Sequence, residues 1–138
     1  MEITNQIEPW TRQAAFDAVY EHFVAKGAPQ STAMKNGDRV CRYRTEDGKK
    51  CAIGVLVPEH MYSKAMEGLM ASSLWFRGNL PYLSSEITPE FLDHLQQMHD
   101  QYWPETFHST FTEWMRLSLE RFAKAQNLKV PVLARDAG

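Results

Sequence analysis

Cysteine is scarce in this sequence of 138 residues, which contains only Cys41 and Cys51. Two thiols cannot form the dense disulfide framework of a small secreted protein. Long hydrophobic runs are also missing, because the apolar stretch Ala52–Val57 falls far short of the ~20 residues that cross a bilayer. The segment Met1–Asn5 lacks the basic and apolar regions of a secretory signal. We therefore expect a cytoplasmic protein with reduced thiols and no contact with membranes.

The sequence has no strong excess of charge of either sign. Its formal net charge is −2, from 15 basic and 17 acidic residues. A protein that coats nucleic acid would be basic, and a protein that mimics DNA would be far more acidic. The overall charge therefore argues against both classes of protein.

The motifs of common enzyme classes are missing as well. The sequence has no glycine-rich dinucleotide-binding motif, no Walker phosphate loop and no Gly-x-Ser-x-Gly nucleophile motif. It also has no internal repeat, heptad run or low-complexity tract. We therefore predict no catalytic residue and no cofactor, and the sequence favours a protein that is not an enzyme.

The amino-acid composition is typical of one folded domain. Hydrophobic residues make up 43% of the chain and aromatic residues 12%, which is enough to build a core. A chain of this length is typical of a single domain. We predict one globular domain over residues 1–128 and a loosely held tail over residues 129–138.

Four segments carry apolar residues at the spacing of amphipathic helices. The first extends from Trp10 to Lys26, and the second from Pro58 to Met70. The third begins at Thr88, where threonine and the following proline are typical of a helix start. The fourth extends from Pro104 to Asn127, and residues 71–86 between the second and third helices are expected to form a loop.

The segment between the first two helices has the pattern of a β-hairpin. Val40–Thr45 favours a strand, and Cys51–Val57 is a mainly apolar segment that we interpret as its partner. Asp47–Gly48 between them is a typical tight-turn pair. The predicted fold is therefore α+β, with about four helices packed around one antiparallel hairpin. Turn-forming residues also occur at Lys35–Asp38.

The two cysteines belong to this predicted hairpin. With a two-residue turn, Cys41 and Cys51 point to opposite faces, so a disulfide between them is not expected; a three-residue loop would shift the pairing. Cys41, Cys51 and His60 are residue types that bind zinc, but their spacing, Cys-x9-Cys-x8-His, lacks a Cys-x2-Cys knuckle. Buried structural thiols are the favoured interpretation, with no metal, and a catalytic thiol remains an alternative.

Basic residues are concentrated in the same hairpin. Arginine side chains and an aromatic ring are suited to binding phosphate, bases or acidic protein surfaces. Three acidic residues, Asp38, Glu46 and Asp47, partly neutralise these charges, so a solvated hairpin is the alternative. The predicted binding residues here are Arg39, Arg42, Tyr43, Arg44, Lys49 and Lys50, with Gly48 in a structural role at the turn.

Three further features complete the set of candidate residues. Trp75 and Phe76 lie in the expected loop, where an exposed aromatic pair would be a binding anchor. Glu67 is predicted to receive Arg42 or Arg44 and so to fix the hairpin to the next element. The histidine and aspartate residues of the third helix are expected on its surface; they are Asp93, His94, His99 and Asp100.

One group of known proteins resembles this chain. The elements Cys41–Arg44, Gly48–Gly54 and Leu56-x-Pro58 are similar to a C-x-Y-R…G-x-K-C-A-x-G-x-L-x-P pattern in small proteins of phages and prophages. Tyr62, the Met-Glu-Gly at 66–68 and a Leu-Gln…His-Asp pattern at 95–100 continue this resemblance, which extends from residue 12 to residue 127.

The resemblance implies a phage or mobile-element origin and supplies no activity. Many small phage proteins without motifs bind and inhibit a host factor, including CRISPR effectors. We therefore expect an interaction protein that binds a host protein or complex in the cytoplasm. A small nucleic-acid-associated regulator is the second interpretation, and a cysteine- or metal-dependent enzyme is the third. The oligomeric state is not predicted.

Overall fold

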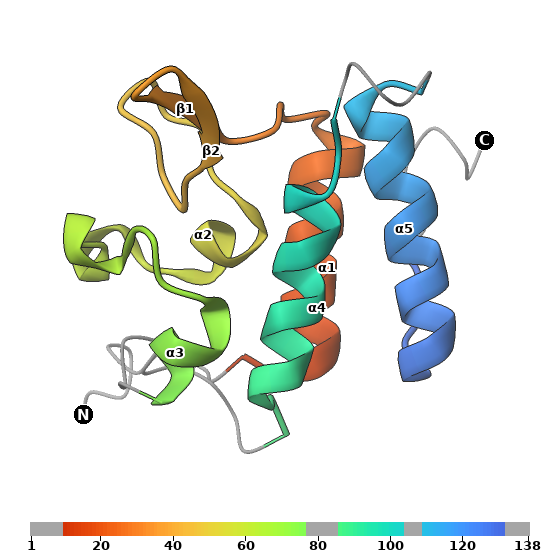
Figure 1. Ribbon diagram of the computed structural model, residues 1–138. Coiled ribbons are helices and arrows are strands. Elements are labelled where there is room, and N and C mark those ends of the chain that lie inside the picture. The colour runs from red at the N-terminus through yellow and green to blue at the C-terminus, as the bar shows by residue number, and fades with distance from the viewer. Residues whose placement is uncertain (1–9, 77–85, 104–108, 132–138) are drawn as a thin grey trace.

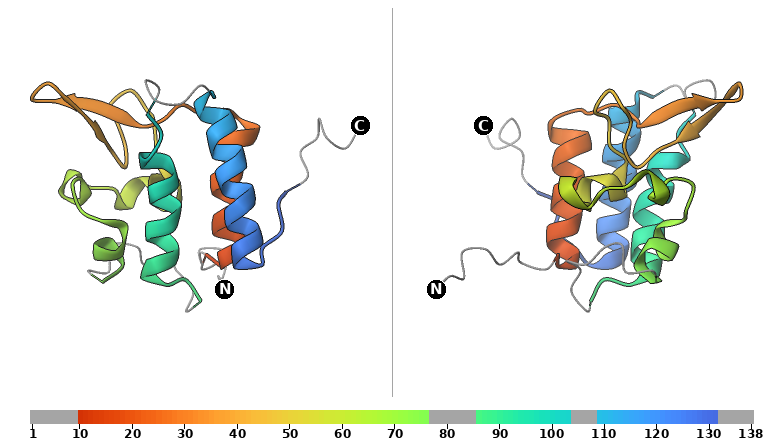
Figure 2. Two further views of the ribbon diagram at one scale, coloured as in Figure 1. Left: turned by 45° about the vertical axis from the view of Figure 1, so that its right-hand side comes forward. Right: turned by 90° about the vertical axis from the view of Figure 1, so that its left-hand side faces the viewer.

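The computed structural model describes residues 10–76, 86–103 and 109–131. Within these residues, five α-helices and one two-stranded antiparallel sheet form the regular structure (Figure 1). This confirms the predicted α+β class, which is mostly helical with one hairpin. The hairpin projects from one end of the helical part in every view (Figures 1 and 2).

Three helices form the main body of the fold: α1 (Arg12–Tyr20), α4 (Pro89–Asp100) and α5 (Phe111–Gln126). They lie roughly side by side (Figure 1), and aromatic rings fill the space between them. The rings of Phe16 and Phe122 stack with their centroids 6.2 Å apart, and both side chains are buried. The apolar stripes of these helices therefore face one another, as their spacing predicts.

The ends of these helices follow local capping chemistry. Thr11 and Thr88 accept hydrogen bonds at the starts of α1 and α4, and a π-helix (Glu21–Ala25) continues α1. The fourth predicted helix starts later than expected, because Thr110 caps α5, and residues 104–108 lie outside the described residues. Asn127 ends α5 in the left-handed conformation, which confirms the predicted end.

The hairpin is not where we predicted it. Its strands are β1 (Thr32–Lys35) and β2 (Asp38–Cys41), and they are joined by Asn36 and Gly37. Both turn residues have positive φ, of 53° and 84°, as a type I′ turn requires. The stronger hairpin signal is thus Asn36–Gly37, because Asn-Gly fits both positions of this turn and its twist suits the strands.

The predicted second strand, Cys51–Val57, is wrong. It forms the short helix α2 (Ala52–Leu56), whose first turn is capped by the Cys51 sulfur, 3.3 Å from the Gly54 nitrogen. A short apolar run does not distinguish a strand from a buried helix. Here α2 packs against α1 and α4, so its residues are buried on nearly every side.

The region after α2 also differs from the predicted helix and loop. Two 3₁₀ turns, Glu59–Met61 and Lys64–Met66, replace the helix expected over residues 58–70. Part of the expected loop forms α3 (Ala71–Phe76), which packs against α4. Gly68 has a φ of 81°, which breaks a continuous helix at this point. Residues 77–85 lie outside the described residues.

Beyond α5, the chain returns to α1. The amide of Gln13 donates to the carbonyl oxygen of Lys129 at 2.7 Å and accepts from the Lys129 N–H at 2.9 Å. The domain boundary after residue 128 stays a prediction. In the described part of the chain, no helix has both the length and the apolar character that a membrane span requires.

Candidate functional site

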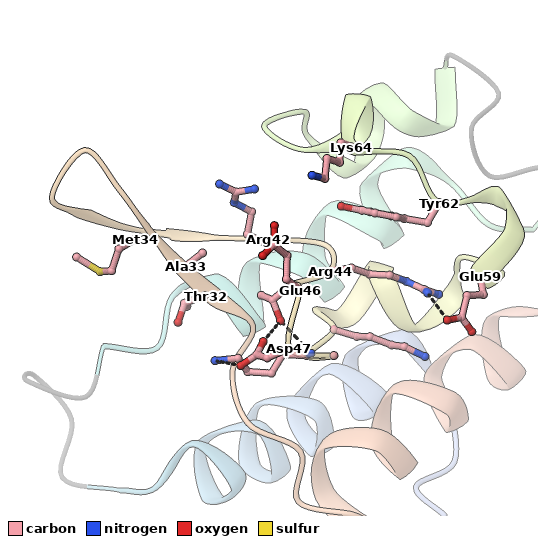
Figure 3. Close-up of a pocket in the computed structure, with 14 residues that line it drawn as sticks. Thr32, Ala33, Met34, Arg42, Arg44, Glu46, Asp47, Glu59, Tyr62 and Lys64 are labelled. Atoms are coloured by element: carbon pink, nitrogen blue, oxygen red, sulfur yellow. Dashed lines mark hydrogen bonds and ion pairs between the residues drawn. The ribbon is translucent and has the colours of Figure 1, made fainter.

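An open groove of about 900 Å³ lies between β1, the turn at 45–49 and the segment 59–64 (Figure 3). We call it the basic groove. It includes four of the residues predicted to bind a partner and brings them together with residues from two other parts of the chain. The residues that line it are Thr32, Ala33, Met34, Arg42, Arg44, Thr45, Glu46, Asp47, Gly48, Lys49, Lys50, Glu59, Tyr62 and Lys64.

One wall of the basic groove is a tight turn with a three-residue loop. The Thr45 N–H donates to the Lys49 carbonyl at 3.0 Å, and Arg44 forms a β-bridge with Lys50. Gly48 adopts a φ of 92°, a conformation that glycine accepts without strain. The register therefore differs by one residue from that of the two-residue turn we predicted, in which Arg44 would face Cys51. The pairing ends where α2 begins.

Glu67 anchors the segment that leads into this turn. Its carboxylate accepts hydrogen bonds from the backbone N–H groups of Tyr43 at 2.9 Å and Arg44 at 3.1 Å. The Tyr62 hydroxyl donates to the same carboxylate at 2.5 Å. The sequence predicted that Glu67 receives an arginine side chain; it holds the same segment, but through the backbone.

Arg44 is part of the groove wall and has little freedom. Its Nη2 donates to the Val57 carbonyl at 2.5 Å, and its Nη1 lies 4.0 Å from a Glu59 carboxylate oxygen. The guanidinium also lies 5.6 Å from the centroid of the Tyr62 ring. The side chain is only 12% exposed. Arg44 therefore joins the turn to the 59–62 segment.

The charge of the basic groove is positive. Five basic and three acidic side chains line it, which gives a net formal charge of +2 in a chain of net charge −2. Two of the acids are already paired with groove cations, Glu59 with Arg44 and Asp47 with Lys49, at 4.0 and 3.5 Å. Three cations of the groove form no ion pair with a described residue: Arg42, Lys50 and Lys64.

Two predicted binding residues have internal roles instead. Tyr43 is 5% exposed and its hydroxyl donates to the Leu69 carbonyl, so its ring offers no face for stacking. Arg39 donates to Gln30 Oε1 at 3.0 Å and to the Tyr102 carbonyl at 3.1 Å. Its guanidinium lies 4.3 Å from the ring centroid of Trp103, outside the basic groove.

The predicted aromatic anchor lies elsewhere. Trp75, in α3, is partly exposed and its Nε1 donates to the Ile87 carbonyl at 3.2 Å. It does not line the basic groove. The side chain of Phe76 lies outside the described residues.

Sequence reasoning missed the groove residues contributed by β1 and by the 59–64 segment. These include Met34, Tyr62 and Lys64. The available signal for β1 was Asn36–Gly37, which would have placed a strand directly before it. The 59–64 segment carries no comparable local signal, because its position depends on the contacts of Glu67.

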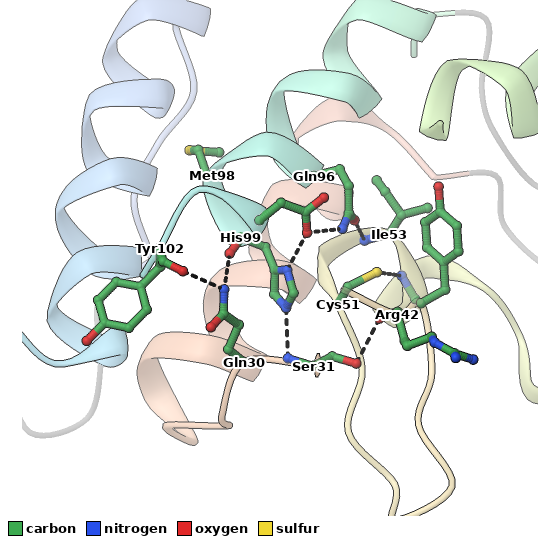
Figure 4. Close-up of polar contacts among 12 residues, drawn as sticks. Gln30, Ser31, Arg42, Cys51, Ile53, Gln96, Met98, His99 and Tyr102 are labelled. Atoms are coloured by element: carbon green, nitrogen blue, oxygen red, sulfur yellow. Dashed lines mark hydrogen bonds and ion pairs between the residues drawn. The ribbon is translucent and has the colours of Figure 1, made fainter. Parts of the chain in front are cut away.

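His99 corrects another prediction, since it is fully buried and not on the helix surface (Figure 4). Its Nε2 accepts a hydrogen bond from the Ser31 N–H at 2.9 Å, so Nδ1 carries the proton. Nδ1 lies 2.7 Å from an Asp100 carboxylate oxygen and donates to it. This network ties α4 to the start of β1 and so orients the hairpin that borders the basic groove.

The structure does not bring together Cys41, Cys51 and His60, the three residues that the sequence offered as possible zinc ligands. Cys51 is buried at the start of α2 and His60 lies in an exposed turn. In the described residues the one cluster of three is Cys41, His99 and Asp100, with ligand atoms within 4.8 Å of one another. Both nitrogens of His99 are already used in hydrogen bonds, so this cluster is better explained as a structural network.

The environments of the thiols also argue against a nucleophile. Burial raises the pKa of Cys41 to about 12, and the negative charge of Asp100 acts in the same direction. Burial likewise raises the pKa of Cys51. A catalytic thiol requires the opposite shift, because the thiolate is the reactive form.

Comparisons with protein-family models, with curated proteins and with solved structures give no match to this chain. The candidate site therefore depends on its own geometry, and the resemblance to phage proteins stays a prediction.

Proposed function

We propose that this chain is a non-enzymatic interaction protein that binds an acidic region of a host protein or complex through the basic groove. The observation that carries this proposal is the local charge of +2 in a chain of net charge −2. Opposite charge steers association and selects among partners. The resemblance to phage proteins supports a host target, such as an enzyme of bacterial defence.

A protein partner is better supported than nucleic acid. Glu46, Asp47 and Glu59 line the same groove and would repel a continuous phosphate backbone. Tyr43, the aromatic residue that the sequence offered for base stacking, is buried. An acidic protein region can place its charges selectively against Arg42, Lys50 and Lys64.

Affinity purification from a bacterial lysate with two matched double variants tests this function. Arg42→Glu with Lys64→Glu reverses two cations of the basic groove. Arg121→Glu with Lys124→Glu makes the same change in net charge on exposed positions of α5. We expect a specific protein to be recovered by the unmodified chain and by the α5 variant, and to be lost from the groove variant.

Recovery of the same proteins by both variants, or of no specific protein by the unmodified chain, would contradict the proposal. Recovery should also weaken as salt increases, because exposed charges are screened. Nuclease treatment of the lysate separates direct capture from capture through nucleic acid. A partner that disappears after nuclease treatment would support the nucleic-acid alternative instead.

A further inference from the structure

The outer edge of β1 is unpaired within the described part of the chain. The register pairs Lys35 with Asp38 beside the turn, and the Arg42 N–H donates to the Ser31 carbonyl at 3.1 Å at the other end. Hydrogen-bonded and non-hydrogen-bonded pairs alternate in an antiparallel ladder. Thr32 and Met34 therefore direct their N–H and C=O groups away from β2.

The basic groove runs along this edge. Thr32, Ala33 and Met34 are consecutive, and their side chains alternate between the two faces of the hairpin, yet all three line the groove. No residue of β2 lines it. Met34 is also 67% exposed. The groove therefore gives access to the outward backbone groups of β1.

Arg42, Lys50 and Lys64 border the same space. Figure 3 shows Lys64 beside Tyr62 and Arg42 on the side of the groove nearer β1, and Lys50 also lines the groove. The side chains of an extended segment project alternately to its two sides. A segment that lay along β1 would thus present every second side chain toward these cations while its backbone faced the strand.

We propose that the basic groove binds an extended, acidic segment of its partner by adding it as a strand to the outer edge of β1. This inference rests on the proposed function and specifies the form of the ligand. Backbone hydrogen bonds to Thr32 and Met34 supply the register, and acidic side chains facing Arg42, Lys50 and Lys64 supply selectivity. The exposed Met34 side chain contributes an apolar contact beside them.

A short peptide of alternating glutamate and valine is a direct probe. Fluorescence anisotropy at low salt should show binding to the full chain. Methylation of the peptide nitrogens on the edge that faces β1 removes the backbone donors but keeps every charge. We expect this change to weaken binding at least about tenfold, because the strand hydrogen bonds are lost. Methylation of the opposite edge is the matched control.

Variants of the protein separate this inference from the proposed function. Met34→Pro removes one outward N–H, and proline is tolerated on an outer edge of a sheet. We expect it to weaken binding of the peptide and of the lysate partner, with circular dichroism confirming the fold. If Arg42→Glu with Lys64→Glu abolishes partner capture while Met34→Pro and edge methylation have no effect, strand addition is overturned and the function stands.

Two other results would also overturn strand addition. One is a single-stranded oligonucleotide that binds where the peptide does not. The other is equal weakening by methylation of either edge of the peptide. The peptide measurement leaves the protein unchanged, so the inference remains testable even if Met34→Pro fails to fold.

Discussion

The carbonyl oxygen of Tyr43 lies 2.0 Å from the position that a β-carbon on Gly54 would occupy. The segment that leads into the turn of the basic groove therefore lies directly against the backbone of α2. Gly54 is buried in the helix interior, where its lack of a side chain permits this approach.

We expect Gly54→Ala to lower the free energy of unfolding by at least about 2 kcal/mol, because backbone atoms must move apart to admit the methyl group. Urea denaturation followed by circular dichroism measures the change. Gly48→Ala is the control: its β-carbon would meet no atom within 4 Å, so only the positive φ opposes it, at about 1 kcal/mol. A cost for Gly54→Ala no larger than for Gly48→Ala would contradict the close packing.

Glu67→Ala should destabilise the fold by about 1–3 kcal/mol, because the N–H groups of Tyr43 and Arg44 lose their acceptor. Glu67→Gln keeps one acceptor oxygen and should cost less. Chemical denaturation of both variants provides the measurement. The exposed Glu46 supplies a control, since Glu46→Ala should change the unfolding free energy by less than about 0.5 kcal/mol. Equal effects of Glu67→Ala and Glu46→Ala would refute the anchoring role.

Stability should depend on pH through His22. Burial lowers the pKa of His22 below its ordinary value of 6.5, and the positive charges of Lys50 and Lys26, together with His99, act in the same direction. The unfolded chain thus binds a proton at a higher pH than the folded chain. The contribution to stability is present above pH 6.5 and is lost as pH falls toward the folded-state pKa.

Denaturation curves at several pH values between 5 and 8 test this relationship, with those of His22→Phe for comparison. The free energy of unfolding of this variant should decrease less than that of the unmodified chain as the pH falls. An NMR titration of the His22 ring reports its pKa directly. A value at or above 6.5 would rule out this assignment.

Both cysteines should react slowly with iodoacetamide in the folded protein. With its pKa raised to about 12, Cys41 carries little thiolate at pH 8, and we expect alkylation at least about tenfold slower than in the denatured chain. Cys51 is fully buried and should react only on unfolding. Mass spectrometry of digested samples distinguishes the two sites. Rapid alkylation of Cys41 in the native state would restore the thiol-nucleophile alternative.

The three long helices, α1, α4 and α5, were the predictable part of this fold, because their signals are local, whereas the helix predicted over residues 58–70 was wrong. Thr88 and Asn127 mark helix ends by their own capping chemistry, and the apolar stripes of α1, α4 and α5 follow helical spacing. The segment from Cys51 to Val57 was not predictable, since it is buried on nearly all sides and so carries no periodic pattern.

The site was predictable only in part, because several of its contacts join distant residues. The basic residues around the turn drew attention from the sequence, and four of them do line the groove. The sequence could not show that the Arg39 guanidinium would lie over the Trp103 ring or that Tyr43 would be buried. His99 looked like a surface residue because its partner Ser31 is 68 positions away.

The outer edge of β1, which is unpaired within the described part of the chain, has a consequence for self-association. An unpaired strand edge is a template on which a second copy of the same chain can assemble. Pairing two copies through this edge would bring two positively charged grooves together, each with Arg42, Lys50 and Lys64. Like charges would oppose that contact, and β1 is only four residues long. The same side chains that favour an acidic ligand would therefore discourage aggregation through this edge of the sheet.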